Sequence, residues 1–360
     1  MAPLYLGDTA ISKIYKGSTE LAQNYLGDST MLATGPTGTD HFGILTYSGD
    51  NSNPRNITGL DFDPGMVWVK NRSSSGENHG MGDILRSPGK LLYPNLSLQE
   101  NGGNYIEPIS NGVKISTGNN NYSGNNYVAW AWKAGGAGTS NSNGTISSTV
   151  SANTEAGFSI VTYSGNNASS ATIGHGLDSA PQLIWVKGRN VSAGWPTLFN
   201  DGSYSHYGIR LNESGVDTGN GGVFFNNTAP TSTVFTVGGA DEVNDGYNYV
   251  AYCFHSVDGY SKVGHYTGTG SVGLTVSLGF QARFIMVKKV HPSGDRWLIA
   301  DTERHAAANN DAFIDATSSH VESDFNCVNG ISFNSDNFVV NTTDGSFNSS
   351  GGKYIYLAIA

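Results

Sequence analysis

The stretch Val67-Trp68-Val69-Lys70 recurs twice in this chain, as Ile184-Trp185-Val186-Lys187 and as Ile285-Met286-Val287-Lys288. Each copy follows a segment that ends in Tyr-Ser/Thr-Gly, and each precedes a closing stretch with a tyrosine near its start. The same order of landmarks in all copies indicates an internal repeat of about 100 residues, which is large enough to bury its own core. Because side chains alternate along a strand, Val67 and Val69 are expected in that core, and Trp68 and Lys70 are expected to face outward or toward a neighbouring sheet.

The composition favours short strands over helices. Glycine accounts for 48 of 360 residues, and charged residues make up only 13%. Glycine and asparagine supply the positive φ angles of tight turns, and no long segment has apolar residues at helical spacing. Each repeat contains roughly seven or eight short apolar runs separated by turn residues. The predicted fold class is therefore all-β, with tandem antiparallel β-sandwich repeats of jelly-roll-like type and a short N-terminal β-meander.

The landmarks divide the chain into five predicted parts. Residues 1–40 form an attachment segment with a linker, and the repeats span 41–136, 157–258 and 259–360. Residues 137–156 are rich in Gly, Ser and Asn, which is typical of a flexible linker or an extended connector. Because the third repeat follows the second without a linker, we expect these two to form one rigid piece, and the first repeat to tilt.

A shorter repeat occupies the N-terminus. Tyr5, Tyr15 and Tyr25 each begin a Tyr-x-Gly turn, ten residues apart, and five-residue stretches separate these turns. The pattern predicts a meander of small hairpins, and such short strands do not hold themselves folded. We therefore predict that residues 1–40 attach the chain to another protein, with these tyrosines as candidate contacts.

Charge and hydropathy exclude several partners. The net charge is −10 and there is no run of Lys and Arg, which argues against binding to nucleic acid or to an anionic membrane. There is no apolar run long enough for membrane insertion and no signal segment, so we expect a soluble protein outside the usual export route. Cys253 and Cys327 lie in different repeats, which predicts no disulfide framework and a buried, inert Cys253.

Three motifs could carry chemistry, and each has a simpler interpretation. Gly268-Thr269-Gly270-Ser271-Val272-Gly273 matches a dinucleotide-binding loop, but a strand-like stretch follows it, which favours a hairpin loop. Asp61-Phe62-Asp63-Pro64-Gly65 lacks the further ligands of a calcium loop, which favours a turn.

Asp301-Thr302-Glu303-Arg304-His305 is the densest titratable cluster. Glycoside cleavage needs two facing carboxyls, and no partner is evident, which favours an exposed ion pair or loop cap. The sequence contains no recognised catalytic motif. We therefore predict no enzyme, no cofactor and no metal, and assign no catalytic residues.

Tryptophan side chains can stack on a ligand, and the positions of the six in this chain indicate which of them are candidates. Trp68, Trp130, Trp132 and Trp185 lie in core strands and are expected to serve packing. Trp195 and Trp297 begin the third strand of their repeats beside loops. These two are the candidates for stacking on a sugar ring or for burial at a subunit contact.

Two further segments carry a resemblance to a known family. They are Asn226-Asn227-Thr228-Ala229-Pro230 and the closing stretch Asn248-Tyr249-Val250-Ala251-Tyr252-Cys253-Phe254. With the landmarks above, the repeat resembles a β-rich domain family common in tail-appendage proteins of bacteriophages, especially marine and cyanobacterial ones. The N-terminal decapeptides look like the head segment of other phage structural proteins. The resemblance is strongest in the second repeat and implies a virion component with lectin-like sandwiches. It brings no catalytic residues.

These observations predict a tail fibre or tail appendage on the virion. Residues 1–40 would dock onto other virion proteins, and the sandwiches would recognise a glycan or protein of the host surface. We expect a homotrimer, because an extended, sparsely charged chain of β-domains needs partners to cover its edges. The alternatives are a purely structural virion protein, such as a head decoration, baseplate or connector subunit, and a glycan depolymerase.

Overall fold

The computed structural model describes residues 38–86, 88–116, 118–216, 221–305, 312–322 and 330–360, together with the backbone of four short N-terminal strands. The chain divides into two compact units, Met1–Gly35 and Pro36–Ala360. In the first unit, β1 (Leu4–Leu6) pairs antiparallel with β2 (Thr9–Ile11), and β3 (Tyr15–Lys16) with β4 (Thr19–Glu20). These pairs agree with the predicted hairpins. The side chains of Tyr5, Tyr15 and Tyr25 lie outside the described residues, so their role stays a prediction.

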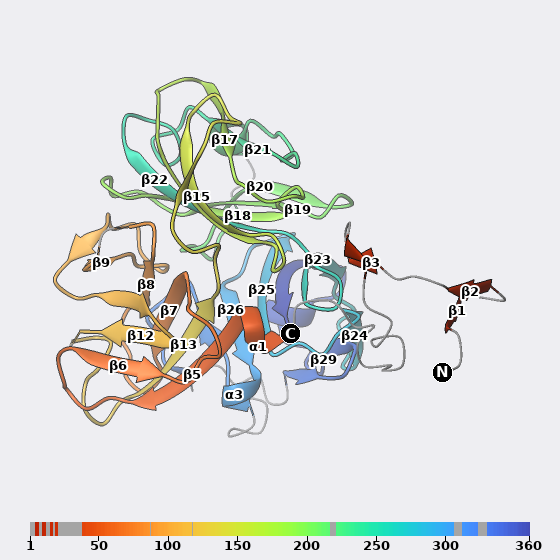
Figure 1. Cartoon of the computed structure of the whole chain (residues 1–360). Helices are drawn as coiled ribbons and strands as arrows, with labels where there is room; N and C mark the ends of the chain where they lie inside the picture. The colour runs from red at the N-terminus through yellow and green to blue at the C-terminus, as the bar shows by residue number, and fades with distance from the viewer. Residues whose placement is uncertain are drawn as a thin grey trace. The chain divides into compact units, whose positions relative to one another are not determined.

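The first repeat is a sandwich of two antiparallel sheets (Figure 1). A four-stranded sheet has the order β5-β13-β7-β8 and faces a three-stranded sheet of order β11-β12-β6, while β9 and β10 pair separately. The elements are α1 (Gly38–His41), β5 (Phe42–Ser48), β6 (Arg55–Thr58), β7 (Met66–Asn71), β8 (Gly80–Asp83), β9 (Lys90–Leu91), β10 (Asn101–Gly102), β11 (Ile106–Ile109), β12 (Gly112–Ile115) and β13 (Asn126–Trp132).

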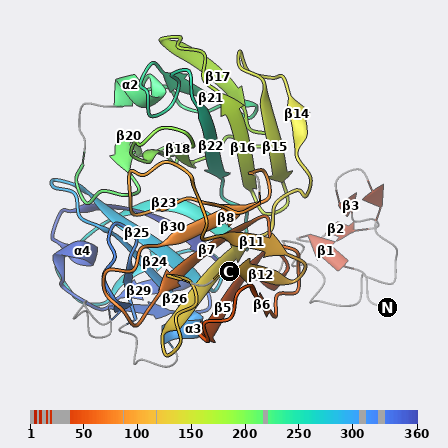
Figure 2. The same ribbon diagram turned by 90° about the vertical axis from the view of Figure 1, so that its left-hand side faces the viewer.

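The second repeat has a seven-stranded sheet of order β14-β15-β16-β22-β18-β19-β20, which faces the pair β17-β21. Figure 2 shows β14, β15, β16 and β22 side by side. The elements are β14 (Thr139–Asn141), β15 (Ser148–Asn153), β16 (Phe158–Ser164), β17 (Ser170–Gly174), β18 (Leu183–Gly188), β19 (Pro196–Asn200), β20 (Ser205–Arg210), α2 (Gly221–Phe225), β21 (Val234–Gly238) and β22 (Asn248–Phe254).

The third repeat has a five-stranded sheet of order β23-β30-β25-β26-β27, which faces a three-stranded sheet of order β24-β29-β28. The elements are β23 (Ser261–Thr267), β24 (Leu274–Ser277), β25 (Phe284–His291), β26 (Trp297–Asp301), α3 (Thr302–His305), β27 (Ile314–Asp315), β28 (Ile331–Phe333), β29 (Asn337–Val340), α4 (Gly345–Asn348) and β30 (Lys353–Ile359).

The three repeats share one plan, which confirms the predicted all-β fold of antiparallel sandwiches. In each main sheet the closing strand lies between the first strand and the strand with the Val/Ile-Trp/Met-Val-Lys pattern. A central strand whose two faces are both covered, by a sheet or by a neighbouring repeat, needs apolar residues on both faces. Strands β13 and β22 are buried from their second residue onward. This explains why the closing stretches are apolar without alternation.

Residues 137–156 are not a flexible linker, and the structure agrees with the other alternative, an extended, strand-like segment. They contain β14 and β15, and β15 pairs antiparallel with β16 along its whole length. Ile146 and Val150 are buried in the core of the second repeat. The composition suggested flexibility, but small polar residues also suit an edge strand that covers a sheet and leaves one face to solvent. This segment therefore belongs to the second repeat.

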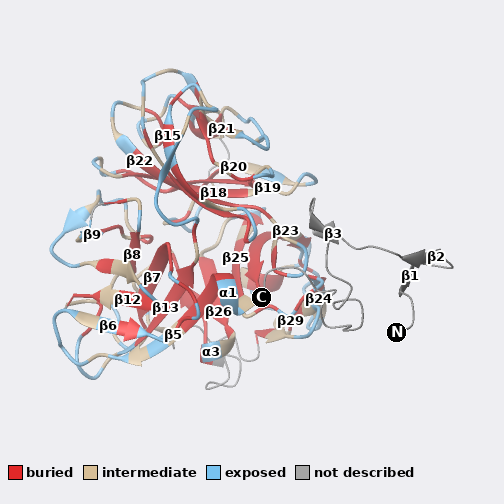
Figure 3. Cartoon of the chain, viewed as in Figure 1, coloured by how far each residue is buried: buried red, intermediate tan, exposed pale blue. Residues whose placement is uncertain are grey.

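Each repeat closes a core between its own two sheets, and a further core joins all three repeats. Val67 and Val69 lie in the first repeat's own core, as predicted. Trp68, Trp185 and Met286, from equivalent places in the three repeats, lie in the shared core. Figure 3 shows the buried residues along the strands where the repeats meet. The first repeat is therefore packed against the others, and the expectation that it tilts is wrong.

Candidate functional site

Three equivalent lysines join the repeats to one another. Lys70, Lys187 and Lys288 are almost completely buried. Each Nζ donates to a backbone carbonyl of its own repeat and to one of another repeat. The contacts between repeats run from Lys70 to Ser319 O at 3.4 Å, from Lys187 to Ser97 O at 3.3 Å and from Lys288 to Glu213 O at 2.7 Å. The first repeat therefore contacts the third, the second contacts the first and the third contacts the second, so one chain closes a ring of equivalent interfaces.

The carbonyl groups replace water around these ammonium groups. Lys288 Nζ also donates to Asp295 O at 2.6 Å and Ser214 O at 3.3 Å. Burial still lowers the pKa of Lys187 to about 8 and that of Lys288 to about 7, because the charged form loses hydration. The repeated Lys is therefore a structural contact in each interface.

The two candidate tryptophans lie in the same interfaces. Trp195 and Trp297 are 0% exposed. Trp195 Nε1 donates to Tyr93 O at 3.0 Å in the first repeat, and Trp297 Nε1 donates to Arg210 O at 3.1 Å in the second. Their ring faces are covered, so a sugar has no access to them. Of the two predicted roles, stacking on a sugar is therefore wrong, and burial at a contact is found, but between repeats of one chain and not between subunits.

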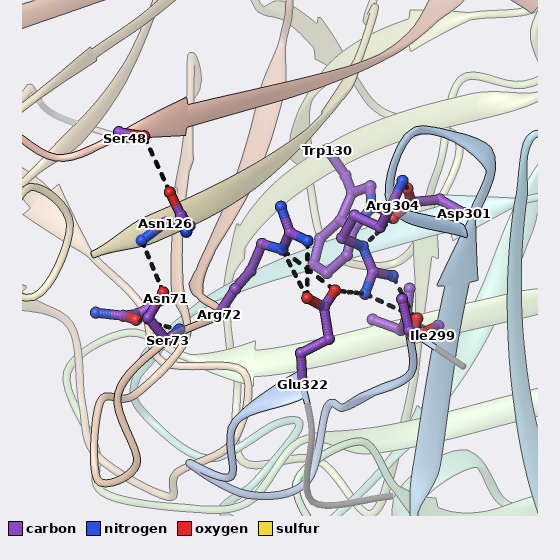
Figure 4. Close-up of polar contacts among 11 residues, drawn as sticks. Ser48, Asn71, Arg72, Ser73, Asn126, Trp130, Ile299, Asp301, Arg304 and Glu322 are labelled. Carbon is purple, nitrogen blue, oxygen red and sulfur yellow. Dashed lines mark hydrogen bonds and ion pairs between the residues drawn. The ribbon is translucent and has the colours of Figure 1, made fainter. Parts of the chain in front are cut away.

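The densest titratable cluster is buried between the first and third repeats (Figure 4). Asp301 Oδ2 accepts from Trp130 Nε1 at 2.9 Å and from Arg304 Nε at 2.5 Å. Glu322 lies 2.8 Å from Arg304 Nη1 and 2.7 Å from Arg72 Nη2, which belongs to the first repeat. Asp301 and Arg304 are 0% exposed. The predicted loop cap is present, because Asp301 Oδ1 accepts from Arg304 N. The Asp301–Arg304 ion pair is buried, whereas Glu303 of the same cluster makes the predicted exposed ion pair, 3.8 Å from Arg283 Nη2.

A matching network joins the second repeat to the first. Asp83 Oδ2 accepts from Tyr252 Oη at 2.6 Å and from Arg86 Nε at 2.6 Å. Glu100 pairs with Arg86 at 3.3 Å and with Arg189 of the second repeat at 3.0 Å. Both carboxylate networks therefore use the same positions of the repeat.

The interface between the third and second repeats is apolar at these positions. Strand register places Phe199 where the other repeats have Asp83 and Asp301. Register also places Leu357 where the other closing strands have Trp130 and Tyr252. Phe199 and Leu357 are buried in the shared core. Where the carboxylate acceptor is lost, the side-chain donor is lost as well.

The remaining motifs have structural roles. The Gly268–Gly273 segment joins β23 to β24 in the opposite sheet, so it is a loop between strands but not a hairpin. Asp63 Oδ1 accepts from Ser110 Oγ and Asn111 N, which lie between β11 and β12, so this carboxylate holds the connection of a neighbouring strand pair. Cys253 is buried, and burial raises the pKa of its thiol, whereas Cys327 lies outside the described residues.

No group of three or more His, Cys, Asp or Glu side chains is placed to hold a metal ion in the described part of the chain. None of the described helices is long and apolar enough to cross a membrane.

A pocket of about 570 Å³ lies on the open side of the third sandwich. It is bordered by the edge strands β23 and β24 and by residues of the second repeat. We call it the β23 pocket. The residues that line it include Gln182, Asp201, Ser256, Gly264, His265 and Tyr356.

A histidine–carboxylate pair is the polar centre of the β23 pocket. His265 Nδ1 lies 2.6 Å from Asp201 Oδ2, across the contact between the third and second repeats. Burial raises the pKa of Asp201, but hydrogen bonds from His265 and from Tyr204 and Ser203 outweigh it and leave the pKa lowered. Because a carboxylate only accepts, Nδ1 carries the proton. Nε2 makes no hydrogen bond to any residue that the structure describes, so it can bind a ligand.

A family model described as a domain of unknown function (DUF7483) matches residues 37–360. No curated protein and no solved structure gives a significant match.

Proposed function

We propose that this chain, which belongs to the family described as a domain of unknown function (DUF7483), is an attachment protein of a bacteriophage particle. Residues 1–35 join it to other virion proteins, as part of a tail fibre or tail appendage. Residues 36–360 form a compact head that binds a glycan or protein on the host surface.

The observation that carries this proposal is the agreement between two boundaries. The compact unit begins at Pro36, and the family match begins at residue 37. The segment with the Tyr-x-Gly decapeptides thus lies outside the domain that defines the family. A separate attachment segment followed by a self-contained domain is the organisation expected of an appendage.

The buried networks support a binding role over catalysis. Both oxygens of Asp301 accept hydrogen bonds from the protein, and the residue is fully buried. A glycan depolymerase needs a pair of carboxyls that reach the substrate, and Asp301 cannot be one of them. That the protein is not an enzyme stays a prediction.

The predicted homotrimer also stays a prediction. Its physical reason was that an extended chain of β-domains needs partners to cover its sheet edges, whereas the shared core packs the three repeats against one another within one chain. Light scattering of the purified chain measures the mass directly. A particle with the mass of one chain would contradict the homotrimer, and a mass of three chains would support it.

The test of the proposed function uses two proteins, the full chain and residues 36–360. Each is labelled and incubated with intact cells of candidate host bacteria, and bound label is measured by flow cytometry. We expect both to bind, because the recognition site lies in the head. If neither binds while the full chain still joins phage particles, the host-recognition role is wrong and a purely structural virion role replaces it.

A further inference from the structure

The second and third repeats differ in what covers one side of the sandwich. In the second repeat, residues 139–153 cover the side between β16 and β17, since β15 pairs with β16 and Ile146 bridges to Ile173 of β17. In the third repeat the matching side lies between β23 and β24, where the β23 pocket lies. This side of the sandwich is therefore covered by residues 139–153 in the second repeat and is open in the third repeat.

Tyr356 places a hydroxyl group in this pocket. The residue is 3% exposed and lines the pocket, yet its hydroxyl makes no hydrogen bond to any residue in the described part of the chain. Its ring packs edge-on against Phe338 with centroids 5.5 Å apart, which fixes the direction of the hydroxyl. The hydroxyl is not among the buried polar atoms that lack a partner, so it is reached from the pocket, where a ligand hydroxyl can take the place of water.

The strand opposite Tyr356 leaves room for that hydroxyl. Gly264 pairs with Tyr356 across β23 and β30, and a Cβ atom at Gly264 would lie 2.6 Å from the hydroxyl oxygen. The other repeats have the opposite arrangement of sizes, with Leu45 opposite Ala129 and Val161 opposite Ala251. The pairing of a small residue with a tyrosine hydroxyl is therefore particular to the third repeat.

The other polar groups of the pocket can both donate and accept. The Gln182 carboxamide oxygen accepts from Ser256 N and Oγ, which fixes the amide, and its nitrogen makes no hydrogen bond to a described residue. His265 Nε2 is available, as described above. The Asp201 carboxylate already accepts from His265 and from the backbone of Ser203 and Tyr204, and Asp258 and Lys262, which are of opposite charge, line the same pocket. This set suits an uncharged ligand with several hydroxyls better than an anion or a metal ion.

We propose that the β23 pocket binds a terminal neutral sugar residue of a host-surface glycan, with Tyr356 as the residue that determines affinity. The proposal rests on the proposed function and names the class of ligand. A sugar hydroxyl pairs with the Tyr356 hydroxyl, and others pair with His265 Nε2 and the Gln182 amide. Leu278 and Phe280 line the same pocket and offer apolar contact to the carbon face of the sugar ring.

The test measures sugar binding to the full chain by saturation-transfer NMR and titration calorimetry. The probes are glucose, galactose, mannose, rhamnose and N-acetylglucosamine, each added separately. We expect one of them to bind in the millimolar range. Tyr356→Phe should weaken that binding about five- to tenfold, because it removes one hydrogen bond and leaves the ring in place.

A matched control is Tyr122→Phe, which removes a hydroxyl from an exposed tyrosine outside the pocket and should leave binding unchanged. Gln182→Glu is a second variant. It keeps the oxygen that accepts from Ser256, removes the amide donor and should also weaken binding. Near-UV circular dichroism checks the fold of each variant. The inference is overturned if no probe binds, or if every folded variant in the pocket binds as the unmodified chain does.

The same variants separate this inference from the proposed function. If Tyr356→Phe binds host cells as well as the unmodified chain does, the site is elsewhere and only the pocket assignment is lost. If a sugar binds in the pocket but the full chain binds no host cell, the host-recognition role fails and the sugar site stands.

Discussion

Two of the three interfaces in the ring contain a buried carboxylate network, and the third has apolar residues at the equivalent positions. Asp301 and Asp83 each accept from an aromatic donor of another repeat and from an arginine of their own. Phe199 and Leu357 occupy the equivalent places in the third interface. The same backbone arrangement therefore accepts either a carboxylate with its donors or a pair of apolar side chains. Both sides of the contact must change together, because a buried donor or acceptor without a partner lowers the free energy of unfolding.

The strongest way to break this comparison is Asp301→Ala. It leaves Arg304 buried beside the shared core with one carboxylate partner fewer and removes the acceptor of Trp130 Nε1. We expect the free energy of unfolding to fall by about 3–5 kcal/mol. Urea denaturation followed by tryptophan fluorescence measures this. A loss below about 1 kcal/mol would show that the network contributes little, as exposed pairs do.

Tyr252→Phe tests the donor side of the second network alone. The change removes the hydroxyl that donates to Asp83 Oδ2 and leaves the Asp83–Arg86 pair intact. We expect a loss of about 2 kcal/mol in the same urea assay, since the bond goes to a charged acceptor. An unchanged midpoint would mean that this bond is replaced by water.

Phe199→Leu measures the contribution of apolar contact at the interface between the second and third repeats. Here no polar partner is left behind, and the change removes only part of the apolar contact in the shared core. We expect a loss of about 1 kcal/mol, smaller than either change above. A loss as large as that of Asp301→Ala would contradict the idea that unpaired polar groups make the difference.

The smallest effect is expected from pH at the His265–Asp201 pair. The folded-state pKa of Asp201 is lowered, so the pair contributes stability above the unfolded-state pKa of about 3.9 and loses it as pH falls through the folded-state value. The stability difference between the unmodified chain and Asp201→Asn should therefore shrink toward zero between about pH 5 and the lower, folded-state pKa. A difference that stays constant over this range would contradict the pair's role.

The alternation of side chains along a strand is a local property of the sequence, and it predicts the strands, the sandwich class and the directions of Val67 and Trp68. The shared core cannot be predicted in this way, because runs such as Ile184-Trp185-Val186 show only that both faces of a strand are apolar. They do not identify the surface that covers the second face. Trp195 is covered by carbonyls about a hundred residues earlier in the chain, which no local pattern predicts.

The candidate pocket was readable from the sequence only in part. Aligning the closing strands places Tyr356 opposite Ala129 and Ala251, and this exception could have been found by comparing the repeats. The pair of His265 with Asp201 joins residues 64 positions apart across two repeats, so it required the fold.

Because the closed ring is made by a single chain, its assembly does not depend on the concentration of the protein. Three separate subunits dissociate as their concentration falls, because reassociation depends on encounters between molecules. Repeats linked by peptide bonds keep a high local concentration of one another, so opening and reclosing of an interface depend on no other molecule. A single chain of this kind therefore keeps its three repeats assembled however dilute the protein is.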